Sequence, residues 1–276
     1  MGISVLILTL NEERNIESCL RAVSWSDDVV VLDSFSSDRT VEIARAYGAR
    51  VVQRRFDNEN AHRSASLKVG FRNEWVFNPD ADEICSSELY REMAAFVECC
   101  GSDIDGARMR RKDMFMGTWL RYSSLYPTWH MRLFRPERLT FERHINMRYV
   151  VPGGEGRLSE HLLHYSFNNG IAAWIDKHNK YSTAEAIETR RSRRNITRSI
   201  RGAMSRDPLL RRAALKEMSQ HVPMRVLLRF LYCYVWRRGF LDGRAGFVYC
   251  QLIAMYEMMI VIKVREEERR SRGDGM

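Results

Sequence analysis

Residues 3–10 read ISVLILTL, a continuous apolar run that has the length of a β-strand and is rich in β-branched side chains. A strand without polar alternation is typical of a central strand buried on both faces of a sheet. The next residues, NEERNIESCLRAV (11–23), space their apolar side chains as a helix does, and DDVVVLDSF (27–35) has the pattern of a second buried strand. A strand, a helix and a strand at this pitch predict a parallel sheet with helices on both faces.

The same alternation continues to about residue 85. The segments that follow predict a helix over 36–48 that ends at Gly48, a third strand over 49–56, a helix over 60–73 and a fourth strand over 74–82. Beyond residue 85 the pattern loosens, and strands of mixed direction are expected, followed by a helix over 172–191. The predicted fold class is α/β with a mostly parallel central sheet.

Three carboxylates, Asp80, Asp82 and Glu83, fall within the stretch FNPDADEICS (77–86) at the end of the fourth strand. Like charges repel, so this cluster lowers stability unless a positive group lies beside it. A divalent cation is one candidate, and a solvated turn before a helix is the alternative. Side chains two positions apart on a strand point the same way, so Asp80 and Asp82 can converge on one Mg²⁺ or Mn²⁺ ion.

Other polar residues follow the first two strands. Open α/β sheets bind ligands beyond the carboxyl ends of their strands. We therefore expect the acidic cluster to lie beside the residues that end these strands, Thr9, Asn11, Glu12 and Asp33. The sequence contains neither G-x-G-x-x-G nor G-x-x-x-x-G-K. A nucleotide diphosphate bound here would therefore need a metal ion rather than a glycine-rich loop.

The net charge of +9 is concentrated in the C-terminal third of the chain. Residues 190–276 carry 20 Lys and Arg against 8 Asp and Glu, whereas residues 1–189 carry 24 against 27. Basic segments bind polyanions such as nucleic acid or an anionic membrane surface. The six cysteines show no C-x-x-C spacing and the N-terminus shows no secretory signal, so free thiols and a cytoplasmic location are expected.

Two apolar stretches follow the arginine-rich run that begins near residue 190. Residues 222–236 are interrupted by Arg225 and Arg229, and residues 245–264 contain Gln251 and Glu257. Polar side chains are costly at the depth of a bilayer. A pair of basic amphipathic helices lying in the membrane interface is therefore favoured, and helices packed on the domain or a true membrane span are the alternatives. Nucleic acid is an unlikely partner because the basic run accompanies apolar helices rather than a recognisable nucleic-acid module.

Several segments together resemble a known family. SVLILTLNEERNIESCL, VVVLDSFSSDRTVEIARAYGARV and the DAD at 80–82 are similar to the nucleotide-binding half of family 2 glycosyltransferases of the GT-A fold. Within that family the chain resembles bacterial enzymes of lipopolysaccharide core and exopolysaccharide biosynthesis, which MFMGTWLRY, YPTWHMRLFR and LLHYSF also resemble. The resemblance covers nearly the whole chain. It implies domains at 1–190, with halves 1–85 and 86–190 for the nucleotide and the acceptor, and a basic helical extension at 191–276.

The resemblance also implies residue roles. Thr9, Asn11, Glu12 and Asp33 would bind the donor nucleotide, Asp80 its ribose or sugar, and Gly117 would lie beside the donor sugar. Asp82 would ligate the metal, and His164 would complete the metal site with the aspartates. From its pattern alone, His164 is equally well explained as a hydrogen-bonded core histidine.

Inverting transfer needs a base that deprotonates the acceptor hydroxyl. Met147 stands where the family carries an acidic residue, which leaves Glu142, His144 and Glu155 as candidates. The hypothesis is a metal-dependent inverting glycosyltransferase that uses a nucleotide-sugar donor and a lipid-linked, lipopolysaccharide or exopolysaccharide acceptor at the inner face of the bacterial inner membrane. The alternatives are a catalytically weak or inactive membrane-associated scaffold of the same fold and a nucleotidyltransferase.

Overall fold

A computed structural model describes residues 2–142, 148–192 and 224–272. The chain divides into two compact units. The first contains Met1–Met114 and Leu125–Asn168, and the second contains Phe115–Ser124 and Asn169–Met276. The predicted domains, 1–190 and 191–276, stay a prediction; in the structure, the helix that follows residue 169 belongs to the second unit.

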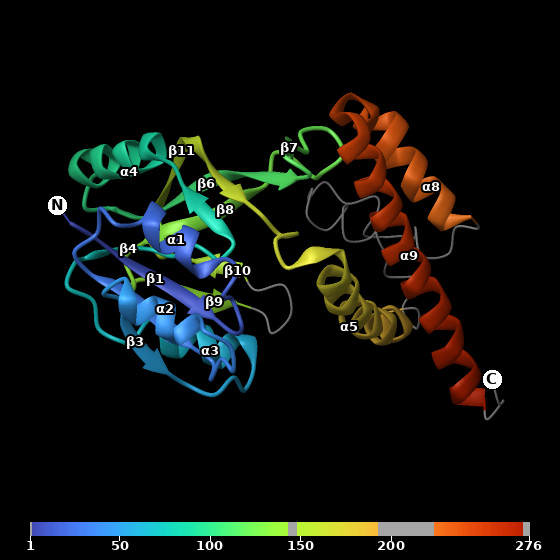
Figure 1. The fold of residues 1–276 in the computed structure, drawn as a ribbon, viewed down its shortest axis with the longest axis horizontal. Coiled ribbons are helices and arrows are strands. Elements are labelled where there is room, and N and C mark those ends of the chain that lie inside the picture. The colour runs from blue at the N-terminus through green and yellow to red at the C-terminus, as the bar shows by residue number, and fades with distance from the viewer. Residues whose placement is uncertain (1, 143–147, 193–223, 273–276) are drawn as a thin grey trace. The chain divides into compact units, whose positions relative to one another are not determined.

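The first unit is built on a sheet with the strand order β3-β2-β1-β4-β8-β6-β11-β5, in which β7 pairs with β6 (Figure 1). Its four parallel strands are β1 (Ile3–Thr9), β2 (Val29–Asp33), β3 (Arg50–Gln53) and β4 (Trp75–Phe77). The others are β5 (Glu83–Cys85), β6 (Ile104–Phe115), β8 (Trp129–Phe134) and β11 (Gly154–His164); β7 (Thr118–Trp119) belongs to the second unit by sequence. Strand β8 runs antiparallel to β4 and β6, and β11 runs parallel to β6 and antiparallel to β5. The predicted α/β fold with a mostly parallel central sheet is confirmed.

Apolar side chains of β1 alternate between two cores. Val5 and Ile7 pack in the core that also receives α1 (Ile16–Ala22), α2 (Thr40–Ala46) and α4 (Ser87–Cys99), whereas Leu6 lies in the core on the opposite face. That second core is covered by residues that follow α3 (Glu59–Ser66) and by the two-stranded sheet of β9 (Thr140–Glu142) and β10 (Arg148–Val150). The continuous apolar run at 3–10 is therefore explained by burial on both faces.

The second unit is helical. It contains α5 (Gly170–Ser192), α8 (Arg225–Leu231), the π-helical turn η2 (Tyr232–Trp236), the 3₁₀ turn η3 (Gly239–Asp242) and α9 (Gly243–Arg272). Helix α9 packs against both α5 and α8. Within the described residues, one stretch, Gly239–Ser271, is long and apolar enough to cross a membrane, and 28% of its most apolar window is buried in the structure.

Asp242 ties the loop at Arg121–Ser123 to the helices of the second unit. Its buried carboxylate accepts hydrogen bonds from the backbone N–H groups of Arg121 (3.2 Å), Tyr122 (3.0 Å) and Ser123 (2.7 Å), and from the Ser123 hydroxyl (2.7 Å). Hydrogen bonds to an ionised acceptor are among the strong ones. This one side chain therefore fixes both the 3₁₀ turn and the loop that precedes Leu125.

Replacing Asp242 by alanine is expected to lower the free energy of unfolding by about 2–4 kcal/mol, because buried N–H groups lose their acceptor. Urea unfolding measures this change, and hydrogen exchange at the amides of Tyr122 and Ser123 should accelerate. The exposed Asp176→Ala on α5 is the matched control and should change stability by less than about 0.5 kcal/mol. Equal stability of the two variants would contradict this assignment.

Candidate functional site

The parallel strands bring three of the predicted residues together at their carboxyl ends. Thr9 on β1 is in register with Asp33 on β2, and Leu8 bridges to Asp80 in the segment after β4. The Thr9 hydroxyl donates a hydrogen bond of 3.0 Å to the Asp33 carboxylate. The expectation that strand ends gather these polar residues at one edge is therefore met by the sheet register.

Asp33 is a fully buried carboxylate with a complete set of partners. Besides Thr9, it accepts hydrogen bonds from the Ser36 amide (2.9 Å), the Ser36 hydroxyl (2.5 Å) and the Gln53 side chain (3.1 Å). Burial raises its pKa, but these hydrogen bonds outweigh burial and hold the pKa below its ordinary value. Asp33 is therefore a fixed, ionised acceptor at the end of β2.

The loops after β1 and β2 are joined by reciprocal hydrogen bonds between side chains and backbone. Asn11 has a left-handed backbone (φ 57°); its amide donates to the Ser36 hydroxyl (2.9 Å) and its side-chain oxygen accepts from the Ser37 amide (2.8 Å). Glu12 donates its amide to the Thr40 hydroxyl (2.8 Å), and its carboxylate accepts from Asn15 (2.7 Å). Asn11 and Glu12 therefore shape the rim of the site through local bonds.

The acidic cluster has a positive partner that the sequence analysis missed. The guanidinium of Arg132, on β8, forms ion pairs with Asp80 and with Glu83, the latter at 2.8 Å between Nη2 and Oε1. Arg132 and Glu83 are both buried. Burial raises the pKa of Asp80, but Arg132 and then Arg63 outweigh burial and lower it; burial keeps the pKa of Glu83 raised despite Arg132. Two of the three clustered carboxylates are thus paired within the protein.

The third carboxylate, Asp82, faces His164. The two side chains approach to 3.4 Å between Oδ2 and Nε2, at the point where β5 and β11 pair. His164 donates its Nδ1–H to Asp113 on β6 at 2.7 Å. Burial disfavours the charged imidazole, but the hydrogen bonds with Asp113 and Asp82 outweigh burial and raise the pKa of His164 to about 9. The fold therefore brings Asp82 and His164 together, and their predicted role as metal ligands stays a prediction.

The chemistry of this pair fits a divalent cation. A histidine that ligates a metal through one ring nitrogen commonly donates its other N–H to a carboxylate, as His164 does to Asp113. Oxygen and imidazole ligands at about 2.0–2.2 Å from one ion lie about 3 Å apart, close to the separation of Asp82 and His164. In the described part of the chain no three His, Cys, Asp or Glu side chains converge on one point. Asp80 is engaged by Arg132 instead.

Glu155, one of the three base candidates, lies far from the Asp82–His164 pair. Glu155 is paired with Gly106 on β6, whereas His164 is paired with Asp113, seven residues further along that strand. At about 3.3 Å per residue, Glu155 lies more than about 20 Å from His164. Arg108 forms a bidentate ion pair with Glu155 (2.6 and 3.0 Å), and this bond lowers the pKa of Glu155 despite partial burial. The fold therefore does not bring Glu155 to the Asp82–His164 pair.

The remaining predicted residues are placed as follows. Glu142 is exposed at the end of β9, opposite Arg148. His144 and Met147 lie outside the described residues. Gly117 belongs to the second unit, in the turn between β6 and β7, where Met116 (φ 49°) and Gly117 (φ 73°) are both left-handed as a tight hairpin requires. Its place beside a donor sugar stays a prediction.

Two further residues close to the cluster carried no signal in the sequence. Arg63, on α3, donates a 2.6 Å hydrogen bond to the phenol oxygen of Tyr149 on β10. Burial lowers the pKa of Arg63, but Tyr149 and then Asp80 outweigh burial and raise it. Tyr149 is partly buried beside Arg63 and Arg132, and this burial raises its pKa. Only tertiary packing brings these residues to Asp80, because each stands in a segment with no motif of its own.

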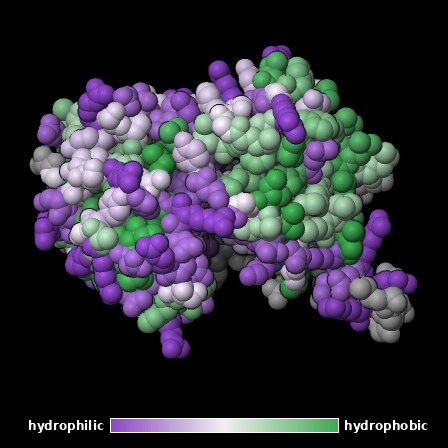
Figure 2. Space-filling view, in the orientation of Figure 1, coloured by the Kyte–Doolittle hydropathy of each residue, from purple (hydrophilic) through white to green (hydrophobic). Residues whose placement is uncertain are grey.

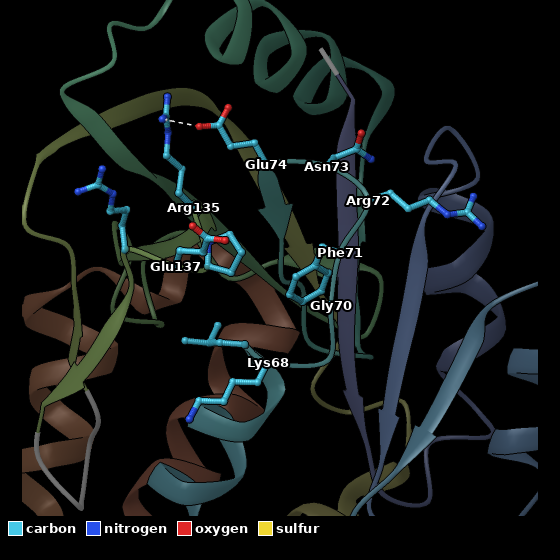
Figure 3. Close-up of a pocket in the computed structure, with 11 residues that line it drawn as sticks. Lys68, Gly70, Phe71, Arg72, Asn73, Glu74, Arg135 and Glu137 are labelled. Carbon is cyan, nitrogen blue, oxygen red and sulfur yellow. Dashed lines mark hydrogen bonds and ion pairs between the residues drawn. The ribbon is translucent and has the colours of Figure 1, made fainter.

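A pocket of about 470 Å³ lies at the opposite edge of the sheet. It is formed by the segment from Leu67 to Glu74, which leads into β4, and by Arg135–Arg138, which follow β8 (Figure 3). Arg135 bridges to Glu74 at 2.6 Å across it. None of the predicted site residues lines this pocket, so the chemistry of the strand ends is separate from it.

Comparison with known sequences identifies the class. The family model described as glycosyl transferase family 2 matches residues 4–162, more than half of the chain, and that span contains Asp33, Asp82 and the strand up to Leu162. The chain therefore belongs to glycosyl transferase family 2 and is a glycosyltransferase.

Individual relatives agree with this assignment. An uncharacterized glycosyltransferase of Rickettsia bellii is 27% identical over 96% of this chain and 86% of its own length. The lipopolysaccharide core biosynthesis glycosyltransferase LpsC of Rhizobium meliloti is 27% identical over 67% of this chain and 71% of its own length. Among solved structures, S. aureus TarS 1–349 is 16% identical with a TM-score of 0.44 over 99% of this chain and 92% of its own length. That likeness is too low for any inference about this protein.

Replacing Arg132 by methionine is expected to lower the free energy of unfolding by about 3–5 kcal/mol, because the buried Glu83 would lose its counter-charge while the partly exposed Asp80 stays beside it. Urea unfolding at neutral pH measures the change. Adding Glu83→Gln to Arg132→Met should recover part of the loss. Arg39→Met, which breaks an exposed ion pair with Glu42, is the control and should cost less than about 1 kcal/mol. A loss for Arg132→Met as small as the control's would refute the counter-charge assignment.

Proposed function

We propose that this glycosyltransferase moves a sugar from a nucleotide-sugar donor to a lipid-linked saccharide or a lipopolysaccharide or exopolysaccharide acceptor, with inversion and with the aid of Mn²⁺ or Mg²⁺. The observation that supports this most directly is the Asp82–His164 pair, which lies at the strand edge that also carries Thr9, Asp33 and Asp80. The family membership supports the transfer, and the likeness to LpsC supports the lipopolysaccharide acceptor.

In this proposal the nucleoside is bound at the ends of β1 and β2, where the buried, hydrogen-bonded Asp33 and Thr9 hold the loops that contact it, and the rim at Asn11 and Glu12 borders it. Asp80, held by Arg132, contacts the ribose or the sugar. Asp82 and His164 hold the divalent ion, and Asp113 keeps the His164 imidazole turned toward Asp82. When bound, the ion supplies positive charge to the diphosphate that leaves.

The acceptor step is a single displacement at the anomeric carbon. The acceptor hydroxyl oxygen forms the new bond to that carbon, the bond from the carbon to the diphosphate oxygen breaks, and a base takes the hydroxyl proton. Glu142 or His144 is proposed as this base. Glu155 is not, because it is paired with Arg108 and lies at the other end of β11.

The location that fits such an acceptor is the cytoplasmic face of the bacterial inner membrane, with the protein bound peripherally through its basic C-terminal helices. An enzyme on the same surface as its acceptor meets a higher effective concentration of that acceptor. If the protein binds the donor but shows no turnover, the alternative of a catalytically weak or inactive scaffold is supported instead.

A thermal-shift screen tests the donor site. UDP-, GDP- and dTDP-sugars are each added with Mn²⁺, with Mg²⁺ and with EDTA. One nucleotide with metal should raise stability by about 2.7 kcal/mol at a hundredfold excess over its dissociation constant. Asp82→Asn should abolish the metal-dependent part of the shift, whereas Asp103→Asn, exposed at the far end of β6, should preserve it. No shift with any donor would refute the donor-site proposal.

Glu155→Gln is expected to keep the turnover number within about threefold of the wild-type value, because neither its position nor its lowered pKa suits a base in the transfer. Glu142→Gln and His144→Asn are measured beside it. One of these two should lower the turnover number by about 10²-fold or more while the thermal shift with donor is unchanged. A hundredfold loss in Glu155→Gln, with unchanged stability, would reverse the assignment.

A further inference from the structure

Helix α8 and the turn η2 expose apolar side chains that a surface helix of a water-soluble protein would normally bury. Along α8 and η2 the outward positions are apolar at helical spacing: Leu227, Leu228, Leu231 and Val235 are all exposed. The less exposed positions include Arg225, Arg229 and Cys233, together with the apolar Val226, Phe230 and Tyr234. A surface helix in water normally places its apolar stripe against the core and its charges outside.

The charges between the two helices are paired. Arg225 forms an ion pair with Glu257 of α9, and their side chains are only 15% and 12% exposed. Glu257 is the acidic residue whose cost at bilayer depth argued against a membrane span. In the structure the Glu257 carboxylate lies between α8 and α9 and forms an ion pair with Arg225. Ionisable residues of helices in contact with lipid face the helix bundle and pair there, as this pair does.

The apolar exposure continues through the turn that joins the helices. Trp236 is 81% exposed, and Phe240 and Leu241 are about half exposed. We define the apolar face as Leu227, Leu228, Leu231, Val235, Trp236, Phe240 and Leu241. Figure 2 shows hydrophobic atoms gathered over the α8 and α9 region. Contiguous exposed apolar surface that is far larger than single scattered side chains marks a site of contact with a protein or a membrane.

The charges around the apolar face decide between those partners. Residues 224–256 contain five arginines, and their single acidic residue, Asp242, is buried against the loop at Arg121–Ser123. Arg238 and Arg244 are exposed directly beside Trp236 and Phe240. Tryptophan and arginine next to aliphatic side chains are the composition of segments that lie at the boundary of lipid headgroups and acyl chains. Anionic headgroups complement this purely cationic border.

We infer that α8, η2, η3 and the start of α9 form a lipid-inserting hairpin, whose apolar face enters the boundary of an anionic bilayer while Arg238 and Arg244 contact lipid phosphates. The inference deepens the membrane partner of the proposed function and rests on it. It differs from electrostatic attachment by the arginine-rich sequence at 190–212, because the apolar face binds the membrane by burying apolar side chains rather than by charge attraction.

Flotation of the full-length protein with vesicles tests the inference. The vesicles are phosphatidylcholine alone or phosphatidylcholine with phosphatidylglycerol, at low salt and at about 0.5 M NaCl, where charge attraction is screened. The triple variant is Leu228→Glu, Leu231→Glu and Trp236→Glu, at positions exposed by 46%, 42% and 81%. Its control is Phe56→Glu, Leu125→Glu and Ile171→Glu, at positions exposed by 57%, 55% and 44%. All six sites are open to solvent, so both variants should fold.

Wild-type protein and the control variant should float with anionic vesicles at both salt concentrations, and the triple variant should lose partitioning by at least about tenfold. The inference is overturned if wild-type protein does not float, or if it floats only at low salt and the triple variant equals it. Sedimentation velocity without lipid adds a third measurement. If the wild-type protein does not float but forms a dimer that the triple variant does not form, the apolar face is a contact between two copies of the chain. Donor thermal shifts are independent of each result, so failure of lipid insertion and failure of the donor site are told apart.

Discussion

The buried guanidinium of Arg132 is the interaction on which the candidate site depends. It joins β8, in the middle of the sheet, to Asp80 and Glu83 on the segment that leaves β4. Three carboxylates in four positions would otherwise repel one another. Because Arg132 forms ion pairs with Asp80 and with the buried Glu83, Asp82 is left to face His164, and Asp113 accepts a hydrogen bond from the other ring nitrogen of His164. The pairing of Asp82 with His164 therefore depends on the ion pairs that Arg132 forms with Asp80 and Glu83.

Local sequence patterns could predict the parts of this architecture that depend on near neighbours. Burial of ISVLILTL on two faces, and the gathering of Thr9, Asp33 and Asp80 at one edge, follow from apolar runs and from the rule that parallel strands end together. Arg132 could not be found this way, because its partners lie about fifty residues earlier and β8 enters the sheet antiparallel between β4 and β6. The separation of Glu155 from His164 follows from the length of β11, which carries both residues near its two ends.

In the C-terminal helices, too, the sequence alone does not show where a charged side chain lies. The sequence predicts basic and apolar helices and indicates that Glu257 disfavours deep membrane contact. In the structure Glu257 pairs with Arg225 between the two helices, so its charge is not presented on the exposed apolar face. Composition alone does not say which face of a helix a charge occupies when the apolar residues are numerous on every side.

The loops after β1 and β2 have a thermodynamic consequence for ligand capture. Asn11 has a left-handed backbone. Its amide donates a hydrogen bond to the Ser36 hydroxyl and its side-chain oxygen accepts one from the Ser37 amide, so the two loops are held together. Chain segments that are already ordered surrender little conformational freedom when a ligand arrives. The fold itself therefore orders this rim, and in the proposed donor site the conformational entropy of the rim is lost during folding rather than on binding.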